Sequence, residues 1–457
     1  MDKIESIFAK VLKDIKPDDE ESRALVAHTN ELVDRLKKAV PKDVEIVVVG
    51  STAHGTNLRG DSDVDIFLLF GNGSSKDEIT RRGMAYAKSI VRKENNERYE
   101  IKYAEHPYVR VYLDDYGINA DIVPAMKIHS IDEMVTAVDR SPLHVEFINS
   151  RLTKKQKDDV RLLKYLLKVH HIYGAEIKIK GFSGYLCELL IYSFGSLRAL
   201  LSAAASSFKV PLYINPLDSK EKVTPDVIKK FNSNFIVIDP VDHKRNVAAG
   251  VSIETLARFV LIARAFMKRP SIEMFYGHGF PGTRARTLID NFIKSSGLDL
   301  YLIRMPLPDK SEDILWPQLK KVADETIDYA SKFGFDVYIS AEWIEHSEQG
   351  FIMFVAPRMH LKSRLAKGPD VLRGNFAESF IESHRKALGI IVKGTSIYAL
   401  EKNHYSNIEE LFRALASGKI IGRRKDLNFR KAKLFVNKIP REYAESVFAQ
   451  LFEKTSI

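Results

Sequence analysis

Two aspartates separated by one residue precede an apolar segment. In the stretch VVVGSTAHGTNLRGDSDVDIFLLF, residues 47–70, Asp63 and Asp65 come just before a run that predicts a buried strand. Side chains two residues apart in a strand point to the same face, so these carboxylates lie side by side. Adjacent carboxylates resist joint ionisation, and a divalent cation such as Mg²⁺ removes that penalty. The pattern favours a metal site over a solvated strand edge, whereas Asp61 is expected to be an exposed turn residue.

A third carboxylate is needed if two metal ions are to act together. Asp121 is the candidate, because in INADIV, residues 118–123, it alternates with three apolar residues and therefore faces away from them. A neighbouring strand would bring it beside the aspartate pair. The alternative reading is an exposed acid of a hairpin.

Gly50 and Ser51 end the first apolar run of this stretch and are expected to open a short helix. Glycine allows a close approach of the backbone, and a serine hydroxyl with the amides of a helix start offers donors to a phosphate. A Gly-Ser pair alone is a weak signal, but next to two aspartates it predicts a nucleotide site.

The elements that must position these residues form a small α/β domain. Strands are predicted at 45–49 and 63–70, helices at 17–40 and 76–93, and a hairpin at 108–126. The helix over 17–40 has acidic residues in its first turn and lysines in its last, which match the helix dipole. Residues 1–140 are therefore predicted to be one domain with a mixed sheet.

Two further regions follow. Helical periodicity dominates residues 158–268 and predicts a helical domain over 141–270. In residues 271–457, a strand at 298–306, a helix at 314–333 and strands within 335–344 and 350–359 predict an antiparallel sheet with helices on one face. The fold class is α+β with several domains.

The amino-acid composition indicates which kinds of binding partner and which compartment to expect. The chain has 457 residues, 70 Lys and Arg against 60 Asp and Glu, and a net charge of +10, which favours a polyanionic partner such as a nucleic acid over a merely basic soluble protein. The single cysteine, Cys187, excludes a disulfide framework and is expected in a core. No apolar run of about 18 residues is present, and the charged amphipathic N-terminus is unlike a signal peptide. A cytoplasmic protein without a membrane span is expected.

The spacing of Gly50-Ser51, Asp63-Val-Asp65 and Asp121 resembles that of the polymerase-β-like nucleotidyltransferases. Segments such as IKYAEHPYVRV, SPLHVEF, RLLKYLLK, GAEIKIKGFSGYLCELLI and VIDPVDHKRNVAAGVS resemble the class I, archaeal-type, CCA-adding enzymes over the first 270 residues, and more loosely beyond. The resemblance implies a nucleotidyltransferase catalytic head, a helical central domain and a C-terminal tRNA-binding region. It also implies addition of C, C and A to the tRNA 3′ end from CTP and ATP, without a template and with release of pyrophosphate.

The resemblance also implies roles for individual residues. Asp63, Asp65 and Asp121 match the carboxylates that bind two Mg²⁺ ions and carry catalysis. Residues matching nucleotide-binding positions are Gly50, Ser51, His54, His144, Lys164, Tyr173 and Arg245. His54 stands where relatives carry arginine, which puts the charge of one triphosphate contact in question. The residues alone leave a structural alternative for three of these positions. Lys164 could be a solvated lysine, Tyr173 a core tyrosine and His144 an ordinary loop histidine.

The resemblance implies that Arg245 lies near the base of the incoming nucleotide. Arginine only donates hydrogen bonds, and cytosine N3 and adenine N1 accept them, whereas uracil N3 and guanine N1 carry hydrogens. A fixed donor would therefore accept C and A. The alternative is an ion pair of Arg245 with Asp239 or Asp242.

The segment GRRKDLNFRKAK is expected to contact the tRNA body through its cations, Arg423, Arg424, Lys425, Arg430, Lys431 and Lys433. The resemblance also suggests a homodimer. Within the same superfamily, a poly(A) polymerase or oligoadenylate synthetase remains an alternative. An inactive RNA-binding protein on the same scaffold is the alternative from another class.

Overall fold

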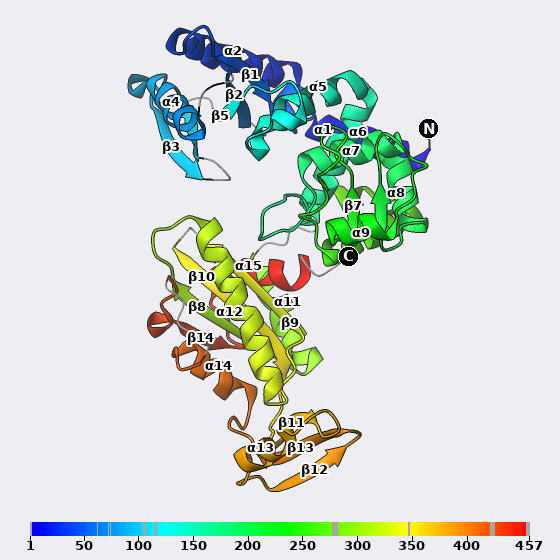
Figure 1. Cartoon of the computed structure of the whole chain (residues 1–457), viewed down its shortest axis with the longest axis vertical. Coiled ribbons are helices and arrows are strands. Elements are labelled where there is room, and N and C mark those ends of the chain that lie inside the picture. The colour runs from blue at the N-terminus through cyan, green and yellow to red at the C-terminus, as the bar shows by residue number, and fades with distance from the viewer. Residues whose placement is uncertain are drawn as a thin grey trace. The chain divides into compact units, whose positions relative to one another are not determined.

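The computed structural model describes residues 2–61, 63–71, 73, 75–103, 107–113, 117–276, 282–345, 348–420 and 426–453. The chain divides into two compact units, residues 1–277 and residues 278–456 (Figure 1). The six basic residues predicted to bind RNA include Arg423, Arg424 and Lys425, which lie outside the described residues.

One part of the first unit is built on a five-stranded mixed sheet in the order β1-β2-β5-β4-β3. β2 and β5 are parallel and the other pairs are antiparallel, as a mixed sheet requires. The strands are β1 (Glu45–Val49), β2 (Asp63–Phe70), β3 (Glu97–Tyr103), β4 (Pro107–Leu113) and β5 (Ile118–Met126). The two predicted strands and the hairpin are confirmed, while β3 was not predicted.

Helices α2 (Asp19–Ala39) and α4 (Lys76–Ser89) cover one face of this sheet. Their apolar residues share a core with Val64, Ile66 and Ile122, which alternate with the aspartates along their strands. The helix predicted to run to residue 93 ends at Ser89. Beyond it, the Arg92 backbone N–H donates to the carboxylate of Glu97, the first residue of β3. Alternation of side chains then leaves Asp63, Asp65 and Asp121 on the opposite face.

The second part of this unit is helical. Its core is formed by α1 (Lys3–Ile15), α6 (Lys154–Val169), α7 (Gly184–Phe194), α8 (Leu197–Ser206) and α10 (Ile253–Lys268), with α5 (Ser141–Arg151), α9 (Pro225–Phe231) and the short parallel pair β6 (Leu212–Ile214) and β7 (Phe235–Val237) beside them. The N-terminal helix α1 packs its buried face into this helical core. The domain limits at residues 140 and 270 stay a prediction.

No single helix in the described ranges has the length and apolarity to cross a bilayer. Helices α7 and α8 together meet that length and composition, but they are bent by 87° at the break between Phe194 and Leu197, and both bury apolar residues in the helical core.

The second unit has a four-stranded antiparallel sheet in the order β14-β8-β10-β9. Its strands are β8 (Leu298–Pro306), β9 (Ile339–Glu345), β10 (Gln349–Pro357) and β14 (Lys433–Val436), and its helices are α11 (Gly282–Ser296), α12 (Glu312–Lys332), α14 (Ile408–Ala416) and α15 (Ala444–Phe448). A separate three-stranded sheet, order β11-β13-β12, carries α13 (Phe376–Ser383) and comprises β11 (Ser363–Asp370), β12 (Gly389–Lys393) and β13 (Ser396–Lys402).

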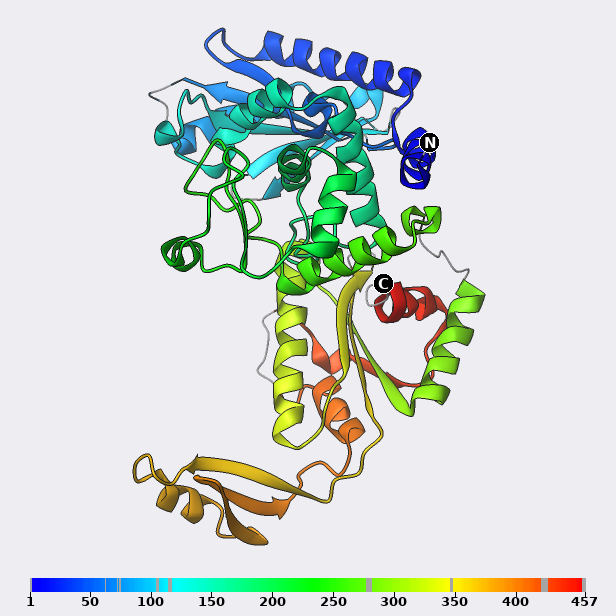
Figure 2. The same cartoon turned by 90° about the vertical axis from the view of Figure 1, so that its right-hand side faces the viewer.

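The prediction of helices on one face of the four-stranded sheet is wrong. Helices α12 and α14 pack on one face and α11 with α15 on the other (Figure 2). Every residue of β10 from Gly350 to Ala356 is buried, because both faces of this central strand meet helices. The unbroken apolar run FIMFVA was the signal, since a strand with one solvated face alternates instead.

Candidate active site

The register of β2 and β5 aligns the three aspartates. Asp65 lies directly opposite Asp121, and Asp63 lies opposite Asn119. The Asn119 side-chain amide donates to Asp63 Oδ1 at 3.0 Å. The structure thus brings together the three carboxylates that sequence reasoning selected, on the face of the sheet away from α2 and α4.

Asp65 has an unusual electrostatic environment. Burial, followed by the charges of Asp121 and Asp63, raises the pKa of Asp65 to about 7. A carboxylate held among like charges is stabilised by a cation. The donor set, three carboxylates on two adjacent strands, therefore suits a divalent metal ion in its chemistry.

Arg110 on β4 donates hydrogen bonds to both carboxylate oxygens of Asp121. Its Nε donates to Asp121 Oδ1 and its Nη2 to Asp121 Oδ2, both at 2.6 Å. This contact raises the pKa of Arg110. Among the described residues, no group of three or more His, Cys, Asp or Glu side chains converges on a common point suited to a metal ion. Both oxygens of Asp121 accept from Arg110, so a metal ion bound by Asp121 would share these oxygens with the guanidinium or displace it.

Gly50 allows a helix to begin directly against Asp65. It opens α3 (Gly50–His54) with a φ of +74°, and a Cβ at this position would lie 2.1 Å from Asp65 Oδ2. Neither the backbone conformation nor the space admits a larger residue. The expected short helix is confirmed, and the close approach that requires glycine is to a carboxylate of the protein itself.

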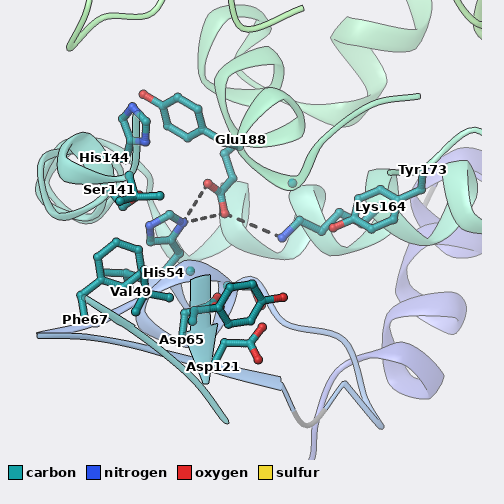
Figure 3. A pocket seen from close by; sticks show the side chains of 17 residues that line it. Val49, His54, Asp65, Phe67, Asp121, Ser141, His144, Lys164, Tyr173 and Glu188 are labelled. Carbon is teal, nitrogen blue, oxygen red and sulfur yellow. Dashed lines mark hydrogen bonds and ion pairs between the residues drawn. The ribbon is translucent and has the colours of Figure 1, made fainter. Parts of the chain in front are cut away.

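A cavity of about 460 Å³ opens beside the carboxylates, within the first unit (Figure 3). Its lining includes eight of the predicted site residues: Gly50, Ser51, His54, Asp65, Asp121, His144, Lys164 and Tyr173. Asp63 and Arg245 are not among the lining residues. The sheet thus supplies the acidic wall, while the helical part contributes Lys164, Tyr173 and Glu188.

Lys164 is 3% exposed, which excludes the reading of a solvated lysine. Its Nζ donates to Thr56 Oγ1 at 3.0 Å and lies 3.8 Å from Glu188 Oε1. His54 is also buried, and its Nδ1 lies 2.8 Å from Glu188 Oε2. Two groups predicted to contact phosphate are therefore joined through one carboxylate.

His144 lies on α5 rather than in a loop, which corrects the alternative reading for this residue. Its ring stacks on Tyr185 with centroids 3.9 Å apart, and its Nε2 lies 3.0 Å from Asp239 Oδ2. Burial lowers the pKa of His144 despite the neighbouring Asp239. Tyr173 is partly buried, and its hydroxyl lies close to Gly184 at the start of α7.

Arg245 forms an ion pair with Asp239, with Nη1 2.9 Å from Oδ2, which agrees with the structural alternative. Asp239 is fully buried and also accepts a hydrogen bond from the Tyr185 hydroxyl at 3.1 Å. Burial raises the pKa of Asp239, but His144 and Arg245 outweigh it and hold the pKa well below its ordinary value. A role of Arg245 in base selection stays a prediction.

Sequence reasoning missed Glu188 and Arg110. Glu188 is the single charged residue of GYLCELLIYSF, and a charge in an otherwise apolar helix was a usable signal of a paired group. Arg110 alternates with Val109 and Val111, so the predicted hairpin already placed it on the face of Asp121.

Of the predicted RNA-binding residues, three can be placed. Arg430 and Lys431 belong to a short 3-10 helix at Phe429–Lys431, and Lys433 begins β14, an edge strand of the four-stranded sheet. All three are exposed. They form a basic edge on the second unit.

The mixed sheet with its aligned aspartates, next to a helix that begins with Gly50 and Ser51, defines a nucleotidyltransferase. Residues 29–155 match the nucleotidyltransferase domain, residues 158–276 the second domain of tRNA nucleotidyltransferase, and residues 296–428 the C-terminal domain of the CCA-adding enzyme. The chain belongs to the CCA-adding enzyme family.

Relatives of similar length support this membership. The CCA-adding enzyme of Methanocaldococcus jannaschii is 35% identical over 434 residues, covering 91% of this chain and 92% of that protein. The CCA-adding enzyme of Sulfurisphaera tokodaii is 34% identical over 409 residues, covering 89% and 91%.

Proposed function

We propose that the cavity beside Asp65 and Asp121 is the place where this chain adds nucleotides to tRNA. As a CCA-adding enzyme, the protein transfers C, C and A to the tRNA 3′ end from CTP and ATP, without a nucleic-acid template and with release of pyrophosphate. The observation that carries the proposal is the direct pairing of Asp65 with Asp121 in the sheet register, beside a cavity that Lys164 also lines.

Asp63, Asp65 and Asp121 are the residues that would hold the metal, and Mg²⁺ is the ion that their oxygen ligands suit best. When bound, such ions activate the RNA 3′-hydroxyl and stabilise charge at the α-phosphate. Gly50 supports this arrangement by leaving room for the Asp65 carboxylate.

The remaining residues bind the nucleotide. Ser51 offers a hydroxyl and Lys164 a buried positive charge to the triphosphate. Tyr173 and His144, on opposite sides of the labelled cluster in Figure 3, provide aromatic surface for the ribose and base. The tRNA body is bound by the basic edge of the second unit, and a homodimer in the cytoplasm is part of the same proposal.

The test is incorporation of each nucleoside triphosphate, alone and in combination, into tRNA that lacks its last three nucleotides. We expect two C with CTP alone, and one A that follows them when ATP is added, after which extension stops. A long tail of A from ATP alone would instead identify a poly(A) polymerase activity, and no incorporation would contradict the proposed catalytic site.

A further inference from the structure

Glu188 is a buried charge to which the proposed catalysis gives no role. It lies on α7 among Leu186, Cys187, Leu189 and Leu190, all buried, and is itself 1% exposed. Removing a lone carboxylate from water is unfavourable, so a buried one persists only where partners compensate. The partners of Glu188 therefore indicate why it is there.

Those partners come from separate segments of the first unit. His54 Nδ1 lies 2.9 Å from Oε1 and 2.8 Å from Oε2, and the Thr56 hydroxyl donates to Oε1 at 2.6 Å. Lys164 on α6 lies 3.8 Å away and donates to the same Thr56 hydroxyl and to its backbone carbonyl. Burial raises the pKa of Glu188, but Lys164, His54 and Thr56 together hold it below its ordinary value, so the group is ionised.

The other nitrogen of the His54 ring has no hydrogen-bond partner among the described residues. His54 Nε2 is buried and makes no hydrogen bond in the described part of the chain, although His54 lines the cavity. A buried polar atom without a partner is destabilising unless a ligand satisfies it. Since Glu188 engages Nδ1, the imidazole is held with Nε2 on the side of the ring away from this carboxylate (Figure 3).

We propose that Glu188 is a positioning residue for the triphosphate: it fixes His54 and Lys164 as a pair of donors for the phosphates beyond the α-phosphate, with His54 Nε2 as one contacting atom. This inference rests on the proposed function, because it takes the cavity as the nucleotide site. Groups that are ordered before the ligand arrives lose less conformational entropy on binding. The same contact gives the His54 ring a fixed orientation at a position where relatives carry arginine.

The variant Glu188→Gln tests the proposal, because it keeps the size of the side chain and removes its charge. Equilibrium binding of CTP and of CMP, each with MgCl₂ and without tRNA, separates contacts to the outer phosphates from all other contacts. We expect CTP affinity to fall about tenfold or more, as for loss of one charged hydrogen bond, and CMP affinity to change less than about twofold.

Two further variants keep the result interpretable. Thr56→Val removes the hydroxyl shared by Glu188 and Lys164 and should reproduce the selective loss of CTP binding in weaker form, even where Glu188→Gln fails to fold. Asp159→Asn is the matched control, because Asp159 is a buried carboxylate of α6 that caps the Leu197 backbone N–H and does not line the cavity. It should change the CTP-to-CMP affinity ratio in no measurable way.

Equal losses for CTP and CMP, or an unchanged CTP affinity, in both Glu188→Gln and Thr56→Val would overturn the positioning role and leave Glu188 as a structural ion pair. Wild-type protein that binds no CTP would overturn the proposed function itself, and the inference with it. A wild-type protein that binds CTP and completes CCA therefore separates failure of the inference from failure of the function.

Discussion

At the scale of residues, the site places negatively charged side chains close together. Donors and positive charges from other strands and helices stabilise them. Asp65 faces Asp121 across the β2–β5 register, Arg110 holds Asp121, and Glu188 is surrounded by donors. Burial disfavours the ionised form of each of these carboxylates, and a neighbouring positive charge offsets that cost. The consequences are measurable with single substitutions.

Asp65→Ala and Asp121→Ala should each abolish nucleotide addition while tRNA binding persists. Both carboxylates are proposed to hold metal, and catalysis by charge stabilisation falls by orders of magnitude when such a group is lost. Single-turnover incorporation of CTP and a tRNA binding isotherm are the measurements. Turnover at a tenth or more of the wild-type rate in either variant would end the three-carboxylate proposal.

The raised pKa of Asp65 makes the stability of the metal-free protein pH-dependent. The ordinary pKa of this carboxyl group, 3.8, applies to the unfolded chain, whereas its pKa in the folded protein is about 7. Between these values the folded state holds a proton that the unfolded state has lost, so the free energy of unfolding falls as pH rises from about 4 to about 7. Asp65→Asn, which cannot ionise, should raise the Tm above pH 7 and change it little near pH 4.

Thermal unfolding of both proteins in EDTA, at a series of pH values, is the measurement. A Tm difference that stays constant from pH 4 to pH 8 would show that ionisation of Asp65 does not limit stability.

Arg245→Ala should relax nucleotide choice more than it slows transfer of a single supplied nucleotide. A bidentate arginine contact discriminates between bases by about 1–3 kcal/mol, so incorporation of UTP relative to CTP should rise about tenfold or more. Lys244→Ala is the control, because this neighbouring lysine is mostly exposed. An unchanged ratio would leave Arg245 with only its ion pair to Asp239.

At the scale of elements, α3 shows how a short segment constrains the site. Its first residue, Gly50, and the residue after its end, Gly55, both have positive φ but differ in surroundings. A Cβ at Gly50 would collide with Asp65, whereas the nearest atom to a Cβ at Gly55 is 3.9 Å away, on Lys157. An alanine would therefore strain the backbone at both positions, but only at Gly50 would it also collide with the Asp65 carboxylate.

Gly50→Ala should therefore reduce the rate of nucleotide addition at least about a hundredfold, since a misplacement of about 1 Å at the chemistry is enough for such a loss. Gly55→Ala should lower stability by about 1 kcal/mol through backbone strain and keep most activity. Rates and Tm values of the two variants form the comparison. Similar activities in both would mean that the approach of α3 to Asp65 has no catalytic importance.

At the scale of the whole molecule, the basic residues of the second unit are predicted to bind the tRNA body. Replacing Arg430, Lys431 and Lys433 with alanine should weaken binding of full-length tRNA and reduce the salt dependence of log Kd by up to about one unit per lost phosphate contact. Replacing Lys222, Lys229 and Lys230 with alanine, three exposed lysines of the first unit, controls for the same loss of net charge. Arg423, Arg424 and Lys425 belong to the same predicted segment.

An acceptor-stem minihelix is the second probe for this prediction, because it lacks the tRNA body. It should lose little affinity when the three cations are removed. Equal losses for the minihelix and the full tRNA would contradict binding of the body by this segment.

The sequence by itself determined several of the elements and the acidic part of the site. Alternation in residues 63–70 and 118–126 placed the three aspartates on one face of two strands, since the side-chain period of a strand is two residues whatever lies around it. Strands β1, β2 and β8 were predicted with their observed limits for the same reason.

Only the tertiary structure decided which residues meet across distant segments. The pairing of His54 and Lys164 through Glu188, the ion pair of Arg245 with Asp239 and the helices on both faces of β10 depend on how elements pack together. Local periodicity indicates which face of an element is apolar, but not what covers it. The partner of a buried charge is fixed by the packed core, where an unpaired charge would be too costly to retain.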